Sequence, residues 1–250
     1  MDSKVWCAIG DSFTYLNDHL DETDNRVTRG YLSRILLKLP ELTLINAGVN
    51  GSTTKDWLDI PVPRADIYTV LLGTNDWHQQ IPLGTEQDFT EEKEGSILGN
   101  MGILMKRIRM VNPLAKILVL NPVERADFIC ILDTLNHAQG SYAPEAGVML
   151  SGVAQAIYRC AVNAGIPAFD LHTECGFTQE NVIHFKWLKK EGSYQKLPYP
   201  DYIGVPYQPE TDEYPYPPEA VALTYDGLHP SDEGNEVLAS LIAKELKKLL

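Results

Sequence analysis

The sequence predicts an α/β protein in which a parallel sheet is flanked by helices. Short apolar stretches alternate along the chain with segments whose apolar residues recur at helical spacing, and this alternation is typical of such a sheet. The composition is that of a globular protein, because 44% of the residues are hydrophobic and 22% are charged. A length of 250 residues fits one large domain or two small ones. We expect a single domain over residues 1–250.

Five short apolar stretches are the expected strands. Strands that are buried on both faces read as nearly continuous apolar runs, and these stretches fit that description. They are residues 5–9, 42–45, 67–72, 117–120 and 166–169. The sheet should therefore be built from all parts of the chain up to about residue 170.

Helices are expected between these strands and at the end of the chain. The expected segments are residues 30–39, 97–111, about 147–164 and about 237–246. In the second of them six apolar residues recur at helical spacing, which predicts a face that packs on the sheet. They are Ile97, Met101, Leu104, Met105, Ile108 and Val111. Asn112-Pro113 follows and should end this helix.

Two segments depart from the alternation. Residues 77–96 are expected to form a polar loop. Residues 172–225 form a long insertion that holds seven of the twelve tyrosines and seven of the sixteen prolines. A stretch of this length with little periodicity is often functional. Its aromatic residues, with Trp187, fit two interpretations: a surface on which sugar rings stack, or a packing layer that holds the insertion on the domain.

Charge and composition exclude several classes of protein. The net charge of -13 argues against a nucleic-acid binder and against docking on anionic lipid. No apolar run approaches the length of a membrane span, and the first residues lack the pattern of a signal peptide, so we expect a cytoplasmic protein. The four cysteines are widely spaced and are expected to be reduced thiols.

The sequence predicts no cofactor and no metal. Residues 48–55 resemble a phosphate-binding loop only superficially, because the lysine follows the threonines and the second glycine comes too early. His172, Glu174 and Cys175 have no neighbours that complete a ligand set. His78 is expected to lie near the pocket described below, because it follows the third strand closely.

Chemistry-bearing residues follow the expected strands. Ligands bind at the carboxyl ends of parallel strands, so functional residues are expected in the loops that follow the strands. Ser12 lies in the turn after the first strand, and a serine needs an adjacent base to become a nucleophile. His229 is the candidate base. Asp226 precedes it by three residues and could orient its ring, so these three residues are the candidate catalytic triad.

An acyl-transfer site also needs donors for the oxyanion of its tetrahedral intermediate. The candidates are the backbone N–H of Ser12, the backbone N–H of Gly48 and the side-chain amide of Asn75, each in a loop that follows a strand. Asp11 and Asp76 stand beside two of these residues and are expected to be structural, as acceptors for local backbone N–H groups.

Together these blocks resemble the SGNH hydrolases, also called the GDSL-like lipase/esterase family. The four signature residues match Ser12 in GDSF, Gly48 in NAGVNGST, Asn75 in GTND and His229 in DGLHPSDEG. The first block has Phe in place of Leu, which keeps an apolar side chain. The resemblance runs over nearly the whole chain, but the insertion at 172–225 matches none of the family's shared blocks.

The resemblance implies a three-layer α/β/α, flavodoxin-like fold with a five-stranded parallel sheet, and ester hydrolysis without a metal. We interpret the chain as a serine esterase that acts on a short-chain ester, with an acetyl ester of a carbohydrate as the candidate substrate. A lipase or thioesterase of the same family and a catalytically silent binding protein are the alternatives. No extended apolar lid segment is visible, which disfavours a long-chain lipase. The oligomeric state stays open.

Overall fold

The central layer of the protein is a parallel sheet of five strands in the order β2-β1-β3-β4-β7. The computed structural model describes residues 3–250. The strands are β1 (Lys4–Gly10), β2 (Leu42–Gly48), β3 (Ile67–Leu71), β4 (Lys116–Leu120) and β7 (Ala168–Phe169). All five expected strands are present, and this confirms the predicted α/β class. The last strand is shorter than expected because only Ala168 and Phe169 pair with β4.

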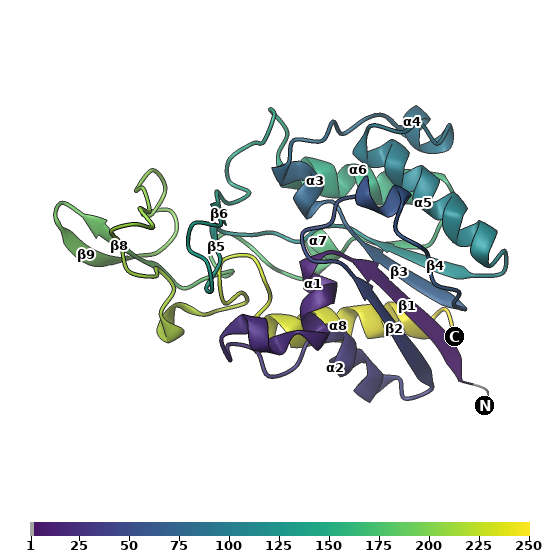
Figure 1. Ribbon diagram of the computed structural model, residues 1–250, viewed down its shortest axis with the longest axis horizontal. Helices are drawn as coiled ribbons and strands as arrows, with labels where there is room; N and C mark the ends of the chain where they lie inside the picture. The colour runs from purple at the N-terminus through teal and green to yellow at the C-terminus, as the bar shows by residue number, and fades with distance from the viewer. Residues whose placement is uncertain (1–2) are drawn as a thin grey trace.

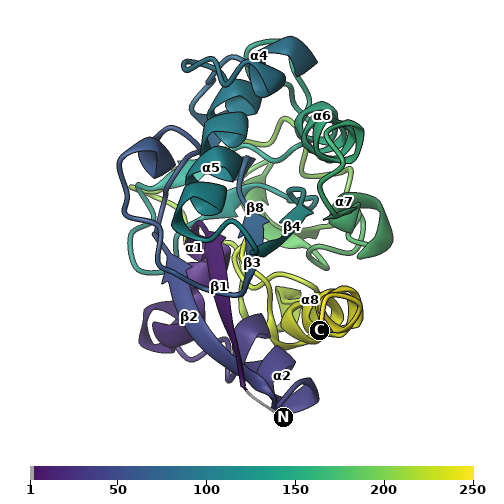
Figure 2. The same cartoon turned by 90° about the vertical axis from the view of Figure 1, so that its right-hand side faces the viewer.

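Helices cover both faces of the sheet (Figure 2). Helices α5 (Ile97–Val111) and α6 (Leu150–Asn163) lie on one face, and α2 (Tyr31–Lys38) and α8 (Asp232–Lys247) lie on the other. The four helices expected from periodicity are therefore present, and the three-layer arrangement is confirmed. Within residues 3–250 no helix combines the length and apolar character that crossing a membrane requires.

Alternation along the strands divides the core into two clusters. In β1, Trp6 and Ala8 pack in the cluster that contains α2 and α8, while Cys7 and Ile9 pack in the cluster that contains α5 and α6. Successive side chains of a strand point to opposite faces, so one apolar run supplies both clusters. All four cysteines are free thiols, as expected.

The strand register brings the segments that follow three neighbouring strands to the carboxyl end of the sheet. Gly10, at the end of β1, pairs with Gly48 on one side and with Leu71 on the other. The segments that leave these residues begin with α1 (Ser12–Tyr15), the loop 49–55 and α3 (Thr74–His78). The carboxyl ends of neighbouring strands thus meet at the position where the sequence places its chemistry-bearing residues.

The expected polar loop at 77–96 contains a short helix, α4 (Glu86–Thr90). Thr85 caps it by accepting a hydrogen bond from the Asp88 backbone N–H, and the Asp88 carboxylate accepts one from the Thr85 N–H. This reciprocal pair satisfies donors that a helix start leaves free. The prediction of a loop was wrong for residues 86–90, because this reciprocal cap stabilises a short helix within a segment of polar composition.

The insertion extends away from the body of the domain (Figure 1). It begins within α7 (Leu171–Glu174) and contains a hairpin of β8 (Lys186–Lys190) and β9 (Ser193–Leu197), and later the turn Pro218–Ala220. A second long segment, residues 121–149, lies between it and the body and carries the short strands β5 (Phe128–Ile129) and β6 (His137–Ala138). No sequence pattern marked this second segment.

The insertion is packed onto the rest of the chain by its apolar side chains. Val182, Ile183 and Leu188 are buried in the same core cluster as Leu238 of α8. Lys186 is 1% exposed and forms an ion pair with Asp127 of the second segment. The packing interpretation of the insertion therefore accounts for part of its composition, and its aromatic residues are considered below.

Candidate active site

Ser12 is the first residue of α1, directly beyond the end of β1. Asp11 caps this helix, since its Oδ1 accepts a hydrogen bond from the Phe13 backbone N–H at 3.1 Å. The Ser12 N–H has no hydrogen-bond partner in the described part of the chain, as expected at a helix start. Ser12 therefore presents its hydroxyl and a free backbone donor at the same place.

His229 joins Ser12 to Asp226. Its Nε2 lies 2.8 Å from the Ser12 Oγ, and its Nδ1 lies 2.6 Å from the Asp226 Oδ2. The other carboxylate oxygen of Asp226 accepts hydrogen bonds from the backbone N–H groups of Leu228 and His229 at 3.0 and 2.7 Å. The structure thus brings together the three residues that the sequence proposed as a triad, and all three are buried.

Three aromatic rings surround the imidazole of His229. Phe128 stands edge-on to it with ring centroids 5.4 Å apart, Tyr225 is stacked at 6.0 Å and Phe13 is tilted at 5.9 Å. These rings limit the access of water and the rotation of the imidazole. Phe128 and Tyr225 were not predicted to belong to the site, although Tyr225 directly precedes Asp226.

Asn75 lies in the first turn of α3, beyond β3. Its Nδ2 donates a hydrogen bond to the backbone carbonyl of Ser52 at 3.0 Å. That bond uses one of the two amide hydrogens and fixes the plane of the amide. The second hydrogen has no partner among residues 3–250 and remains available for a ligand.

Gly48 is placed differently from what an oxyanion donor requires. Its N–H donates a hydrogen bond to the Asn46 Oδ1 at 3.0 Å, so this donor is engaged within the chain. A Cβ at Gly48 would lie 2.2 Å from the backbone nitrogen of Tyr15, which explains why a glycine is needed there. The close packing of β2 against α1, rather than a ligand, accounts for this residue in the structure.

Gly51 lies in the same loop and was not considered from the sequence. Its φ is +72°, nothing lies within 4 Å of where its Cβ would be, and its N–H has no partner within residues 3–250. It directly precedes Ser52, whose carbonyl holds Asn75. The motif NAGVNG contains two glycines. Only the structure shows that Gly48 is packed against α1 whereas the space beside Gly51 is open.

Two buried carboxyl groups lie beside the candidate triad. Burial raises the pKa of Asp11 to about 7 and that of Asp76 to about 6, because each carboxylate would lose its hydration. Asp76 accepts hydrogen bonds from the backbone N–H and the hydroxyl of Thr54. It thereby ties the loop after β2 to α3, which agrees with the structural role expected for it.

The other titratable side chains mentioned above do not form a metal site. Residues 3–250 contain no group of three His, Cys, Asp or Glu side chains close enough to hold a metal ion. His172 lies 2.8 Å from the carbonyl of Pro122 through its Nδ1. The Nδ1 of His78, the last residue of α3, lies 3.6 Å from the Glu145 carboxylate.

The chain matches the GDSL-like lipase/acylhydrolase family over residues 8–237. It belongs to this family. Membership implies hydrolase activity on esters, and a catalytic triad and an oxyanion hole are typical of the family. No relative is found among the curated proteins.

Several solved structures share the fold of this GDSL-like chain. A possible lipase from Chitinophaga pinensis is 44% identical, with 99% of each chain covered and a TM-score of 0.96. A lipase/acylhydrolase from Enterococcus faecalis is 18% identical, with 99% of this chain and 97% of that one covered and a TM-score of 0.53. A carbohydrate acetylesterase family member from Sinorhizobium meliloti is 15% identical, with 99% of each chain covered and a TM-score of 0.54. The last two show the fold alone.

Proposed function

We propose that this protein is a serine esterase that hydrolyses a short-chain ester, with Ser12 as nucleophile. The observation that carries the proposal is the continuous hydrogen-bonded chain from the Ser12 hydroxyl through His229 to Asp226. A serine hydroxyl becomes a nucleophile when a base at hydrogen-bond distance can take its proton, and the base works best when a third group fixes its ring.

The mechanism is acyl transfer. Ser12 Oγ attacks the ester carbonyl while its proton passes to the Nε2 of His229. Asp226 holds the ring by its Nδ1 and stabilises the imidazolium that forms. His229 then gives the proton to the leaving alcohol oxygen as the carbon–oxygen bond breaks. Water enters, loses a proton to His229 and attacks the acyl-enzyme, which releases the acid and restores Ser12.

The negative charge on the carbonyl oxygen needs donors that are already in place. The Ser12 N–H and the second amide hydrogen of Asn75 have no partner among the described residues and suit this role. Gly48 was expected to supply a third donor, and it can do so only by releasing Asn46. The N–H of Gly51 is free without any such change, so we propose it as the alternative third donor.

We further propose an acetyl ester of a carbohydrate as the substrate. One protein of the same fold is a carbohydrate acetylesterase family member, which supports the same substrate class.

A lipase is the second candidate, because the relative that is 44% identical is described as a possible lipase. The deciding experiment is hydrolysis of p-nitrophenyl acetate, butyrate and octanoate by the native protein and by Ser12→Ala. We expect turnover that falls with chain length and disappears in the variant. A rate that rises toward octanoate would favour the lipase. No turnover, with Ser12 also unlabelled by a fluorophosphonate, would leave a catalytically silent binding protein.

A further inference from the structure

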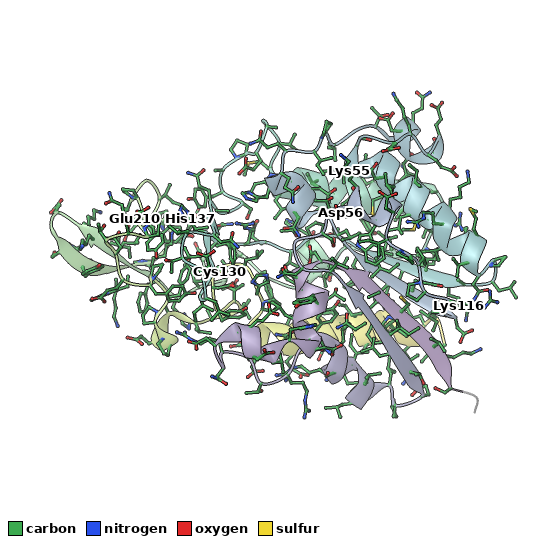
Figure 3. All side chains as sticks on the ribbon, in the orientation of Figure 1. Lys55, Asp56, Lys116, Cys130, His137 and Glu210 are labelled. Atoms are coloured by element: carbon green, nitrogen blue, oxygen red, sulfur yellow. The ribbon has the colours of Figure 1, made fainter. Side chains whose placement is uncertain are left out.

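A second cavity lies at the junction of the insertion and the segment 121–149. Its volume is about 300 Å³, which falls within the range of small-molecule sites. The insertion contributes Lys186 and residues 204–207, and the other segment contributes the remaining lining residues. Figure 3 shows His137, one of these, in the same part of the molecule as Glu210 of the insertion.

Phe128 connects this cavity to the candidate active site. Its side chain lines the cavity, and its ring stands edge-on to His229 at 5.4 Å between centroids. The Ala126 N–H donates to the Gly227 carbonyl at 2.8 Å, and the Ile129 N–H donates to the Asp226 carbonyl at 3.2 Å. The segment that forms one wall of the cavity is therefore bonded directly to the loop that carries Asp226 and His229.

The lining combines flat rings with groups that both donate and accept hydrogen bonds. Four of the lining residues carry rings: Phe128, His137, Tyr142 and Tyr207. The rings of His137 and Tyr207 meet edge to face at 5.9 Å. Gln139 is exposed, and its side-chain amide has no hydrogen-bond partner in the described residues, so it offers one acceptor and two donors.

The charges that line the cavity are balanced. Lys186 is 1% exposed and pairs with Asp127, and its ammonium lies 5.0 Å from the ring centre of Tyr202. Because the pair is self-neutralising, the cavity favours an uncharged ligand. An alkyl chain placed here would leave the Gln139 amide and the edge of the ion pair without partners, which is costly. A ring with several hydroxyl groups would satisfy the polar groups and would pack its C–H face on the aromatic rings.

We propose that this cavity binds the sugar ring of the substrate, whose ester then reaches past Phe128 to Ser12. The proposal rests on the esterase function proposed above and assigns the substrate's alcohol part to a site built by the insertion. It also separates the aromatic residues of the insertion into those that contact the ligand and those that do not. Tyr207 contacts the ligand, whereas Tyr194, stacked on Trp187 at 5.8 Å, does not line the cavity.

The test compares kcat/KM for acetate release from 6-O-acetylglucose, whose other hydroxyl groups are free, with kcat/KM on p-nitrophenyl acetate, which has no sugar. We expect Tyr207→Ala to lower the ratio of the two about tenfold, which corresponds to the loss of one aromatic contact. Gln139→Ala should lower the ratio severalfold and cannot unfold the protein, since this residue is exposed. Tyr194→Ala is the matched control from the same insertion and should leave the ratio unchanged.

The outcomes separate this proposal from the proposed function. If the native protein hydrolyses p-nitrophenyl acetate but both cavity variants keep the native ratio, the esterase stands and the sugar site is wrong. The sugar site is also wrong if the native protein hydrolyses the aryl ester and no acetylated sugar. If the native protein hydrolyses neither ester and fluorophosphonate fails to label Ser12, the esterase function fails and the assignment of the cavity fails with it.

Discussion

The Nε2 of His229 lies 2.8 Å from the Oγ of Ser12, although the two residues are 217 positions apart in the chain. Ser12 is set by the junction of β1 with α1, and His229 by the turn before α8. The sheet and its covering helices therefore hold this geometry. Four predictions test how the neighbouring residues contribute.

Asp226→Asn should lower kcat about 10⁴-fold while the fold is kept. Asparagine can still accept the backbone N–H groups of Leu228 and His229 through its Oδ1. Its amide would then donate to the Nδ1 of His229 and leave the ring proton on Nε2, where the ring cannot accept the proton of Ser12. Turnover of p-nitrophenyl acetate measures the effect, with the exposed Asp59→Asn as control. A loss below tenfold would contradict the orienting role.

Asn75→Ala should lower kcat roughly 10²- to 10³-fold with a smaller change in KM, because its free amide hydrogen would act mainly on the charged intermediate. Asn163→Ala is the control, since Asn163 is exposed on α6 and its side-chain amide donates to Glu86. Steady-state kinetics on p-nitrophenyl acetate separate the two constants. A change confined to KM would assign Asn75 to substrate binding.

Gly227→Ala should destabilise the protein by about 2 kcal/mol more than Gly192→Ala does. Both glycines have a positive φ, +88° and +82°, which costs any other residue. Nothing lies within 4 Å of a Cβ at Gly192, whereas a Cβ at Gly227 would lie 1.9 Å from the carbonyl oxygen of Asp127. Urea unfolding of both variants gives the difference. Equal losses would mean that the loop shifts without cost.

Asp11→Asn should become more stable relative to the native protein as the pH rises from about 4 to about 8. Burial raises the pKa of Asp11 to about 7, so the folded protein holds this proton more tightly than the unfolded chain does. The native protein therefore loses stability as the pH rises through this window, and the variant, which cannot ionise, does not. Asparagine keeps the acceptor for the Phe13 N–H.

Urea unfolding of the native protein and of Asp11→Asn at pH 4.5 and pH 7.5 measures this effect. The difference in free energy of unfolding between the two proteins should move in favour of the variant at the higher pH. A difference that is independent of pH would show that Asp11 is ionised throughout, with its carboxylate stabilised by contacts other than the Phe13 N–H.

The sequence was sufficient where structure depends on local pattern. The continuous apolar run at 117–120 predicts a buried strand, and the periodic apolar face of α5 predicts a helix on the sheet, so the sheet and four helices were predictable. The grouping of Ser12, Asp226 and His229 followed from their positions after strands or before a helix, together with the family resemblance.

Other features depend on contacts between distant segments and leave no local signal. The ion pair of Lys186 with Asp127 joins positions 59 apart, and each residue alone reads as an ordinary surface charge. The segment 121–149 has little periodicity, so its part in the wall beside His229 was not visible. The two glycines of NAGVNG differ only in what their neighbours in space allow.

The loop that carries Asp226 and His229 is joined to the insertion through the segment 121–149. The Asp127 carbonyl accepts the hydroxyl of Tyr216, its carboxylate holds Lys186, and the adjoining backbone bonds to the loop. Local unfolding of the insertion would therefore disturb the loop that carries Asp226 and His229. Both should unfold locally and exchange their amide hydrogens as one cooperative unit. In such a unit, a molecule that binds between the insertion and the segment 121–149 would also steady the imidazole.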